Sequence, residues 1–192
     1  QDIDFLVALR GDPPQGDTEF KAVAGGFRYA NELVEFIRAE FPNFGIAVAG
    51  YPEVHQEAPS ADADLENLKR KIDAGADIVI TQLFYDNKDY FEFCDRCVAA
   101  GINIPIVPGI LPVTNLNQIQ RITSLCGSKL PESFIQRLGE KGEDNTGWQF
   151  EAGVELAIAQ VQDLIDNGAP GVHFYVLNKS QATLRVLETA GW

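Results

Sequence analysis

Short apolar runs rich in β-branched residues alternate along this chain with longer segments of helical spacing. Residues 46–48 and 78–80 are two such runs, and neither shows the strict polar alternation of a half-exposed strand. This pattern is typical of parallel strands that are buried on both faces. Between the runs, apolar residues at helical spacing predict a helix from about 61 to 74. The stretch 45–82 therefore predicts a strand, a polar loop, a helix and a second strand.

The same alternation extends over the rest of the sequence. Further strands are predicted at 4–9, 104–107 and 171–176, and further helices at about 27–40, 87–100, 115–125, 131–139, 148–166 and 181–190. Strict alternation predicts a single α/β domain over residues 1–192, with a parallel sheet and right-handed crossovers. Five strands fit an open doubly wound sheet or part of a (β/α)8 TIM barrel, which has eight strands in about 250 residues. No Gly-x-Gly-x-x-Gly follows a strand, and this favours the barrel, with about three strands missing from this chain.

Composition narrows the classes of partner and compartment. The 192 residues include 28 acidic and 15 basic side chains, which give a net charge of −13. This charge argues against nucleic acid or an anionic membrane as the main partner. No apolar run approaches the roughly 20 residues that span a bilayer, and no signal peptide opens the chain. Three cysteines without a disulfide pattern fit a reducing compartment, which we expect to be the cytoplasm. Cys94 and Cys97 form a C-x-x-C pair inside a predicted helix, where half-buried thiols are favoured over a metal or redox site.

Polar side chains gather where the predicted strands end. They occur in the segments 9–12, 51–55, 81–86, 108–112 and 173–178. The helix after the second strand adds Asp64, Asn67 and Lys71 at helical spacing, with Arg70 beside them. In parallel α/β folds, ligand-binding and catalytic groups lie at the carboxyl ends of the strands. The pattern therefore predicts an enzyme or a ligand-binding protein.

Taken together and in this order, these segments closely resemble the catalytic domain of methylenetetrahydrofolate reductase, a flavoprotein (β/α)8 barrel. The resemblance extends over essentially the whole chain and implies that about the last five strand–helix units of the barrel are present. It also implies a flavin-dependent reductase of one-carbon and methionine metabolism. Such an enzyme binds FAD, oxidises NADH or NADPH, reduces 5,10-methylenetetrahydrofolate to 5-methyltetrahydrofolate, and is expected to be a homo-oligomer when complete.

The resemblance also assigns roles to individual residues. The residues expected to contact FAD are Arg10, Gly11, Asp12, Tyr29, Ala30, Tyr51, His55, Ala58, Asp64, Asn67, Arg70 and Lys71. The residues expected on the substrate side are Gln82, Gln118, Tyr175 and Lys179. Asp12, near the N1 side of the flavin ring, and Gln82, which would hold the pterin and the nicotinamide in turn, are the expected catalytic residues.

Each assignment has a structural alternative. Asp12 fits a helix cap or a turn, although an acid after Arg-Gly at a strand end favours function. For His173, a structural role with a hydrogen-bonded imidazole is at least as good an interpretation as a binding role. Without the resemblance, residues 64–71 would be interpreted as a solvated helix face. Arg70 and Lys71 point in different directions on a helix, so one of the two is a candidate for a solvent-exposed charge.

Two departures from the family pattern limit the functional prediction. Lys179 occupies a position where the family usually has arginine, and lysine lacks the planar fork that binds two acceptors. The family's general acid, a glutamate on the first barrel strand, has no counterpart in this chain. We therefore expect the chain alone to be inactive, as a fragment of a longer protein or one completed by a partner. The alternatives are a non-catalytic flavin- or folate-binding module and another pterin-using barrel enzyme, such as a lyase or a methyltransferase.

Overall fold

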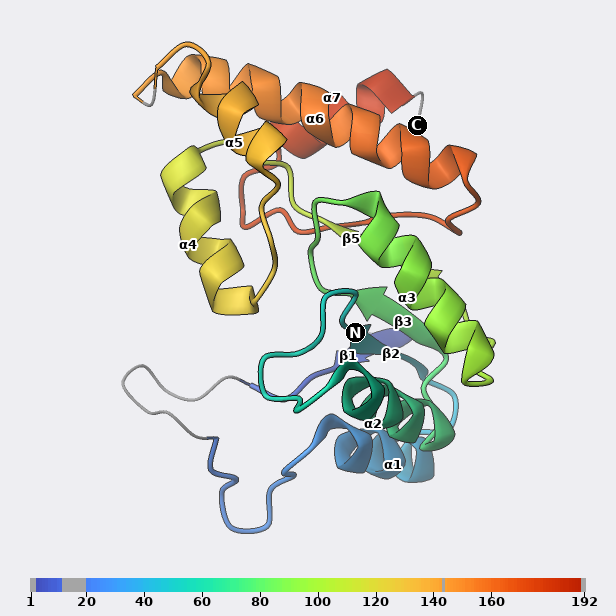
Figure 1. The fold of residues 1–192 in the computed structure, drawn as a ribbon. Coiled ribbons are helices and arrows are strands. Elements are labelled where there is room, and N and C mark those ends of the chain that lie inside the picture. The colour runs from blue at the N-terminus through green and yellow to red at the C-terminus, as the bar shows by residue number, and fades with distance from the viewer. Residues whose placement is uncertain (1–2, 12–19, 143, 191–192) are drawn as a thin grey trace.

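The computed structural model describes residues 3–11, 20–142 and 144–190, in which helices and parallel strands alternate (Figure 1). The first half contains β1 (Phe5–Ala8), α1 (Ala30–Glu40), β2 (Gly45–Gly50), α2 (Ala61–Asp73), β3 (Ile78–Thr81) and α3 (Asn87–Ala99). The second half contains β4 (Ile106–Val107), β5 (Gly109–Ile110), α4 (Leu116–Cys126), α5 (Glu132–Gly139), α6 (Thr146–Asp166), β6 (His173–Phe174) and α7 (Gln181–Ala190). The predicted α/β class is confirmed.

All the strand pairs of the described residues are parallel. β1, β2, β3 and β4 form one sheet in that order, and β5 pairs with β6 in a second, two-stranded sheet. Pro108 separates β4 from β5, and a proline has no N–H to donate to a ladder. Among the described residues, the strands form these two sheets and do not close into a ring. The prediction of a parallel sheet is therefore correct, and the barrel remains a prediction.

Three elements differ most from their predicted bounds, and β5 was not predicted. The strand expected at 104–107 begins only at Ile106, after Pro105, and the strand expected at 171–176 is reduced to two residues. The helix expected from residue 27 begins at Ala30 because Glu32 forms a capping box with the backbone at its start. Pro105 and the capping box account for two of these differences, and the predicted elements keep their order, with β5 added between β4 and α4.

The main core lies between the sheet and the helices. Ile46, Val48 and Val79 project from β2 and β3 and are fully buried against α1, α2 and α3. A second apolar cluster joins α4, α5 and α6 around Leu138, which is also fully buried. Figure 1 shows α1 and α2 together at one end of the molecule and α4 to α7 gathered at the other.

The face of β1 that points away from the core is exposed and apolar. Phe5, Val7 and Leu9 alternate along this edge strand, and their exposed fractions are 76%, 48% and 55%. Alternation places all three on one face, because successive side chains of a strand point to opposite sides. An exposed apolar edge of this kind is a site where further chain could pack.

The cysteine pair lies on α3, as predicted. Cys94 is half-buried and Cys97 is buried, and burial raises the pKa of both thiols, that of Cys97 to about 12. A thiol with a raised pKa is a weak nucleophile and a weak metal ligand. In the described part of the chain, no helix has the length and apolar character needed to cross a membrane.

Candidate functional site

A cavity of about 510 Å³ opens where β1 and β2 end, between the start of α1 and one face of α2. We call it the β1–β2 pocket. Among the twelve residues expected to contact FAD, those that line this pocket are Arg10, Tyr29, Ala30, Tyr51, His55, Ala58, Asp64, Asn67, Arg70 and Lys71. Gly11 is described but does not line the pocket, and Asp12 lies outside the described residues. The structure thus brings four sequence segments together in one cavity.

Lys71 and Asp64 form the charged floor of the β1–β2 pocket. The Lys71 ammonium donates a hydrogen bond to the carbonyl of Ala49 and lies 5.6 Å from the centre of the Tyr51 ring. Burial lowers the pKa of Lys71 to about 8, although the nearby Asp64 carboxylate partly offsets this effect. Burial raises the pKa of Asp64, which accepts a hydrogen bond of 3.0 Å from the backbone N–H of His55. A buried cation beside an open cavity is suited to an anionic ligand.

The other cations of the β1–β2 pocket lie nearer to its rim. Arg70 is exposed and donates to the side-chain oxygen of Asn67 at 2.6 Å. Arg10 forms an ion pair with Glu57, and this hydrogen bond lowers the pKa of the Glu57 carboxyl group. The sequence left open which of Arg70 and Lys71 would face solvent. In the structure both line the pocket, with Lys71 deep and Arg70 at the surface.

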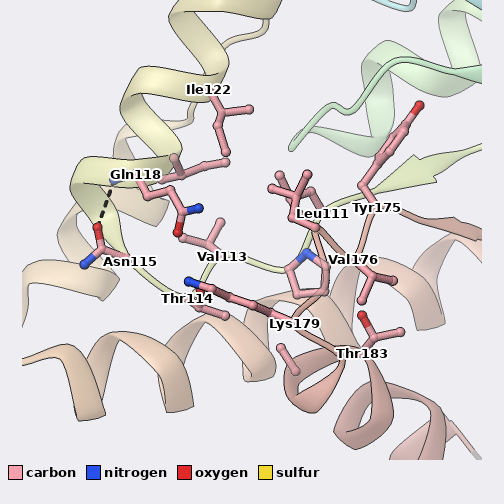
Figure 2. A pocket seen from close by; sticks show the side chains of 14 residues that line it. Leu111, Val113, Thr114, Asn115, Gln118, Ile122, Tyr175, Val176, Lys179 and Thr183 are labelled. Carbon is pink, nitrogen blue, oxygen red and sulfur yellow. Dashed lines mark hydrogen bonds between the residues drawn. The ribbon is translucent and has the colours of Figure 1, made fainter.

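A second, smaller pocket of about 30 Å³ lies beyond β5 and β6, and we call it the β5–β6 pocket. Gln118, Tyr175 and Lys179, three of the residues expected on the substrate side, all line it. Figure 2 shows Gln118 on α4 and Lys179 on the segment before α7, both directed into the pocket from different walls. The rest of the lining is mostly apolar and includes Leu111 and Val113. The pocket thus combines an apolar surface with an amide and a cation.

Tyr175 connects this pocket to the end of β3. Its hydroxyl donates a hydrogen bond of 2.8 Å to the carbonyl of Thr81, and burial raises its pKa to about 12. The ring of His173 packs edge-on against the Tyr175 ring at 5.0 Å. Gly109 lies close by, and a Cβ on this residue would be 2.2 Å from the Thr81 carbonyl oxygen. Glycine is therefore required where the segment after β4 passes the end of β3.

Gln82 lies apart from the lining of both pockets, at the carboxyl end of β3. Its backbone N–H donates to the carbonyl of Gly50, and its side-chain oxygen accepts from the N–H of Leu83 at 2.9 Å. Gln82 directly follows β3, and the carboxyl end of a parallel strand is where ligand-binding groups lie in α/β folds. Its predicted catalytic role stays a prediction.

The sequence reasoning missed several polar residues of these sites. Glu57 and Asn31 line the β1–β2 pocket, and Thr114 and Thr183 line the β5–β6 pocket. Glu57 could have been suspected, since it follows His55 in the loop after β2, whereas the threonines carry no signal in the sequence. In the residues that the structure describes, no group of three or more His, Cys, Asp or Glu side chains could hold a metal ion.

Comparisons with known proteins agree with the residue pattern. The family model described as methylenetetrahydrofolate reductase matches residues 2–191. The chain is 41% identical to a probable methylenetetrahydrofolate reductase (NADH) of Oryza sativa, with 98% of the chain and 33% of that protein aligned. It is 40% identical to the 5,10-methylenetetrahydrofolate reductase of Escherichia coli, with 98% of the chain and 61% of that protein aligned.

A solved structure shares the fold. It is a protein from Clostridium thermocellum that binds two copies of 5-methyl-5,6,7,8-tetrahydrofolic acid. The TM-score is 0.55 at 14% sequence identity, and the match covers 91% of this chain and 63% of that one. The chain thus spans about a third of the rice relative and less than two thirds of the bacterial one.

Proposed function

The chain belongs to the methylenetetrahydrofolate reductase family, and from this premise we propose that it is part of a flavin-dependent reductase. The complete protein would use NADH or NADPH to convert 5,10-methylenetetrahydrofolate to 5-methyltetrahydrofolate, as a cytoplasmic enzyme of one-carbon metabolism and a homo-oligomer. The observation that carries the proposal is the convergence of ten expected FAD contacts on the β1–β2 pocket. Four separate segments of the sequence supply these residues, and they meet only because the chain folds in this way.

The chemistry of the β1–β2 pocket fits a dinucleotide. Its depth holds the buried Lys71 ammonium and its rim holds the Arg70 guanidinium, and both groups suit the pyrophosphate of FAD. Tyr51 and His55 supply aromatic surface, with ring centres 4.6 Å apart. Bound FAD would accept a hydride from the nicotinamide and donate it to the folate. The residues of the chain would bind and orient it.

The side chains that line the β5–β6 pocket suit part of a folate substrate, whose size exceeds the enclosed volume of about 30 Å³. The apolar lining of the pocket suits the flat surface of a pterin or an aminobenzoyl group, and the Gln118 amide offers both a donor and an acceptor. The Lys179 ammonium provides a cation for a carboxylate of the folate tail. The solved structure with a similar fold binds 5-methyl-5,6,7,8-tetrahydrofolic acid, which further supports this class of ligand.

Two titrations of the chain test the cofactor assignment. FAD and riboflavin are each added, and binding is followed by flavin fluorescence. We expect FAD to bind at least about tenfold more tightly than riboflavin, because only FAD carries the pyrophosphate. Lys71→Met should remove most of this preference and leave riboflavin binding nearly unchanged. A folded chain that binds neither flavin, or binds both equally, would contradict the assignment.

Reductase activity is tested with protein expressed from the complete reading frame. Oxidation of NADH and of NADPH is measured with menadione and then with 5,10-methylenetetrahydrofolate as acceptor. Activity with both acceptors is the expected result. Tight FAD binding without any oxidation of either nucleotide would instead support a non-catalytic flavin-binding module.

A further inference from the structure

The loop from Tyr51 to Ala58 lines the β1–β2 pocket, contacts the end of α4 and contains a strained residue. On one side, Tyr51, His55 and Ala58 line the β1–β2 pocket. Val54 has a φ angle of +74°, in the left-handed region that β-branched residues rarely adopt. A strained conformation of this kind persists only where surrounding contacts fix it. Arg96 donates to the Pro52 carbonyl at 3.1 Å, and Glu53 and Gln56 join the loop to α4 and the turn after it.

Glu53 binds the backbone just after α4. Only 6% of its side chain is exposed, and both carboxylate oxygens accept from the backbone N–H of Lys129, at 3.0 and 3.2 Å. The Lys129 ammonium lies 4.0 Å away and is itself 82% exposed, so it contributes little. The contact joins residues 76 positions apart in the sequence. A buried carboxylate that receives a backbone N–H fixes the turn after α4 to the loop.

Gln56 binds the last turn of α4 itself. Its side-chain amide donates to the carbonyls of Ser124 and Leu125, both at 3.2 Å, and carbonyls at a helix end lack partners within the helix. Gly127 closes α4 with a φ of +73°, and a Cβ on this residue would lie 2.7 Å from Cγ of Gln56. The glycine therefore serves both the left-handed cap and the close approach of Gln56.

Helix α4 continues to the other pocket. Gln118 and Ile122, on its first and second turns, line the β5–β6 pocket, and Figure 2 shows both side chains directed toward it. Ser128, just past the helix end, donates a hydrogen bond of 2.8 Å to the carbonyl of Leu83, after β3. The start of α4 thus lines the β5–β6 pocket, and its end is hydrogen-bonded to the loop of the β1–β2 pocket.

We propose that Glu53 and Gln56 are positioning residues that couple the two pockets through α4. A ligand that orders the 51–58 loop in the β1–β2 pocket then also orders α4, and with it the wall of the β5–β6 pocket. The nature of the two ligands, FAD and a reduced folate, rests on the function proposed above. Because linkage is reciprocal, each ligand raises the affinity of the chain for the other by the same factor, about fivefold or more.

The first test uses the ligand-free chain and measures backbone hydrogen exchange. Glu53→Ala should speed exchange about tenfold in 51–58 and in 116–130, while Glu53→Gln, which keeps an acceptor oxygen, stays close to the parent. Gly127→Ala, a change at the end of α4 that contacts Gln56, should likewise speed exchange in 51–58. Gln120→Ala removes an exposed glutamine from the same helix and serves as the matched control. If each variant affects only its own segment, the coupling is overturned.

The second test adds FAD to the same variants. In the parent and in Glu53→Gln, FAD should slow exchange in both segments, whereas in Glu53→Ala it should protect 51–58 alone. Protection confined to 51–58 in the parent would overturn the coupling. Absence of any protection would count against the proposed function, and the ligand-free experiment would then decide the coupling by itself. If Glu53→Ala does not fold, Gln56→Ala replaces it, because Gln56 is exposed and its loss is tolerated more easily.

Discussion

Replacing Lys71 by methionine should stabilise the ligand-free chain near neutral pH. Burial lowers the pKa of Lys71 from the 10.5 of an exposed lysine to about 8. Because one pKa unit corresponds to about 1.4 kcal/mol, the protonated lysine destabilises the folded chain by about 3 kcal/mol at pH 7. Methionine fills a similar volume without a charge. It also removes the hydrogen bond to the Ala49 carbonyl, which costs about 1 kcal/mol. The net gain expected at pH 7 is therefore about 2 kcal/mol.

The sign of the pH dependence follows from the direction of this shift. The unfolded chain binds a proton on Lys71 more tightly than the folded chain does, so its contribution to the free energy of unfolding rises with pH between about 8 and 10.5. Below pH 8 the full penalty is present in the parent, and above pH 10.5 it has disappeared. The advantage of Lys71→Met should thus shrink above pH 8 and change sign between about pH 9 and 10.

Urea unfolding of both proteins at several pH values between 7 and 10.5 measures this difference. The difference between the two free energies of unfolding isolates Lys71 together with Asp64, the carboxylate that interacts with it. The matched control is Lys69→Met, on the same helix, where an exposed ion pair with Asp73 is lost. Lys69→Met should change the free energy of unfolding by no more than about 0.5 kcal/mol at every pH. A difference for Lys71→Met that is unchanged from pH 7 to pH 10 would refute the reasoning.

Three further predictions concern stability. Arg38→Ala should lower the free energy of unfolding by about 2–4 kcal/mol, because Arg38 donates to the carbonyls of three loop residues and to Asp77. Arg38→Lys should restore less than half of this lost stability. Gly153→Ala should destabilise the chain by about 1–3 kcal/mol, because the added Cβ would lie 1.6 Å from the carbonyl oxygen of Val113. Gly147→Ala, in an open part of the same helix, should be neutral or stabilising in the same denaturation assay. The open apolar face of β1 should bind a hydrophobic dye such as anilinonaphthalene sulfonate in the folded chain, and absence of dye fluorescence under native conditions would show that this face is covered.

The sequence predicted the parts of the fold that depend on local pattern. The pattern was sufficient to locate the helices expected at 61–74 and 115–125, and α2 and α4 are observed within one residue of these bounds. The convergence of residues on the β1–β2 pocket was also predictable in outline, because parallel strands end at a common edge. Asn115, which was expected as the first residue of its helix, instead caps α4, and its side chain accepts from the backbone N–H of Gln118 at 2.8 Å.

The contacts between distant segments could not be predicted in the same way. Glu53 and Gln56 are ordinary polar loop residues in the sequence, and their partners lie 76 and 68 positions away. Nothing in the local pattern indicates a buried carboxylate on the turn after α4. The same holds for β5 (Gly109–Ile110), which lies in the segment after the strand expected at 104–107 and was not predicted, because it forms only by pairing with the distant β6.

Strain in the described part of the chain is concentrated at the two pockets. Within residues 3–11, 20–142 and 144–190, the non-glycine residues with positive φ are Val54, Leu177 and Asn178. Val54 belongs to the loop of the β1–β2 pocket, and Leu177 lines the β5–β6 pocket beside Asn178. Lys71, the buried cation, adds a further cost at the first pocket. Such costs are typical of functional sites, because selection for stability alone would remove them. The strain therefore supports both pockets as functional sites without reference to any relative, and a bound ligand is expected to recover part of the lost stability.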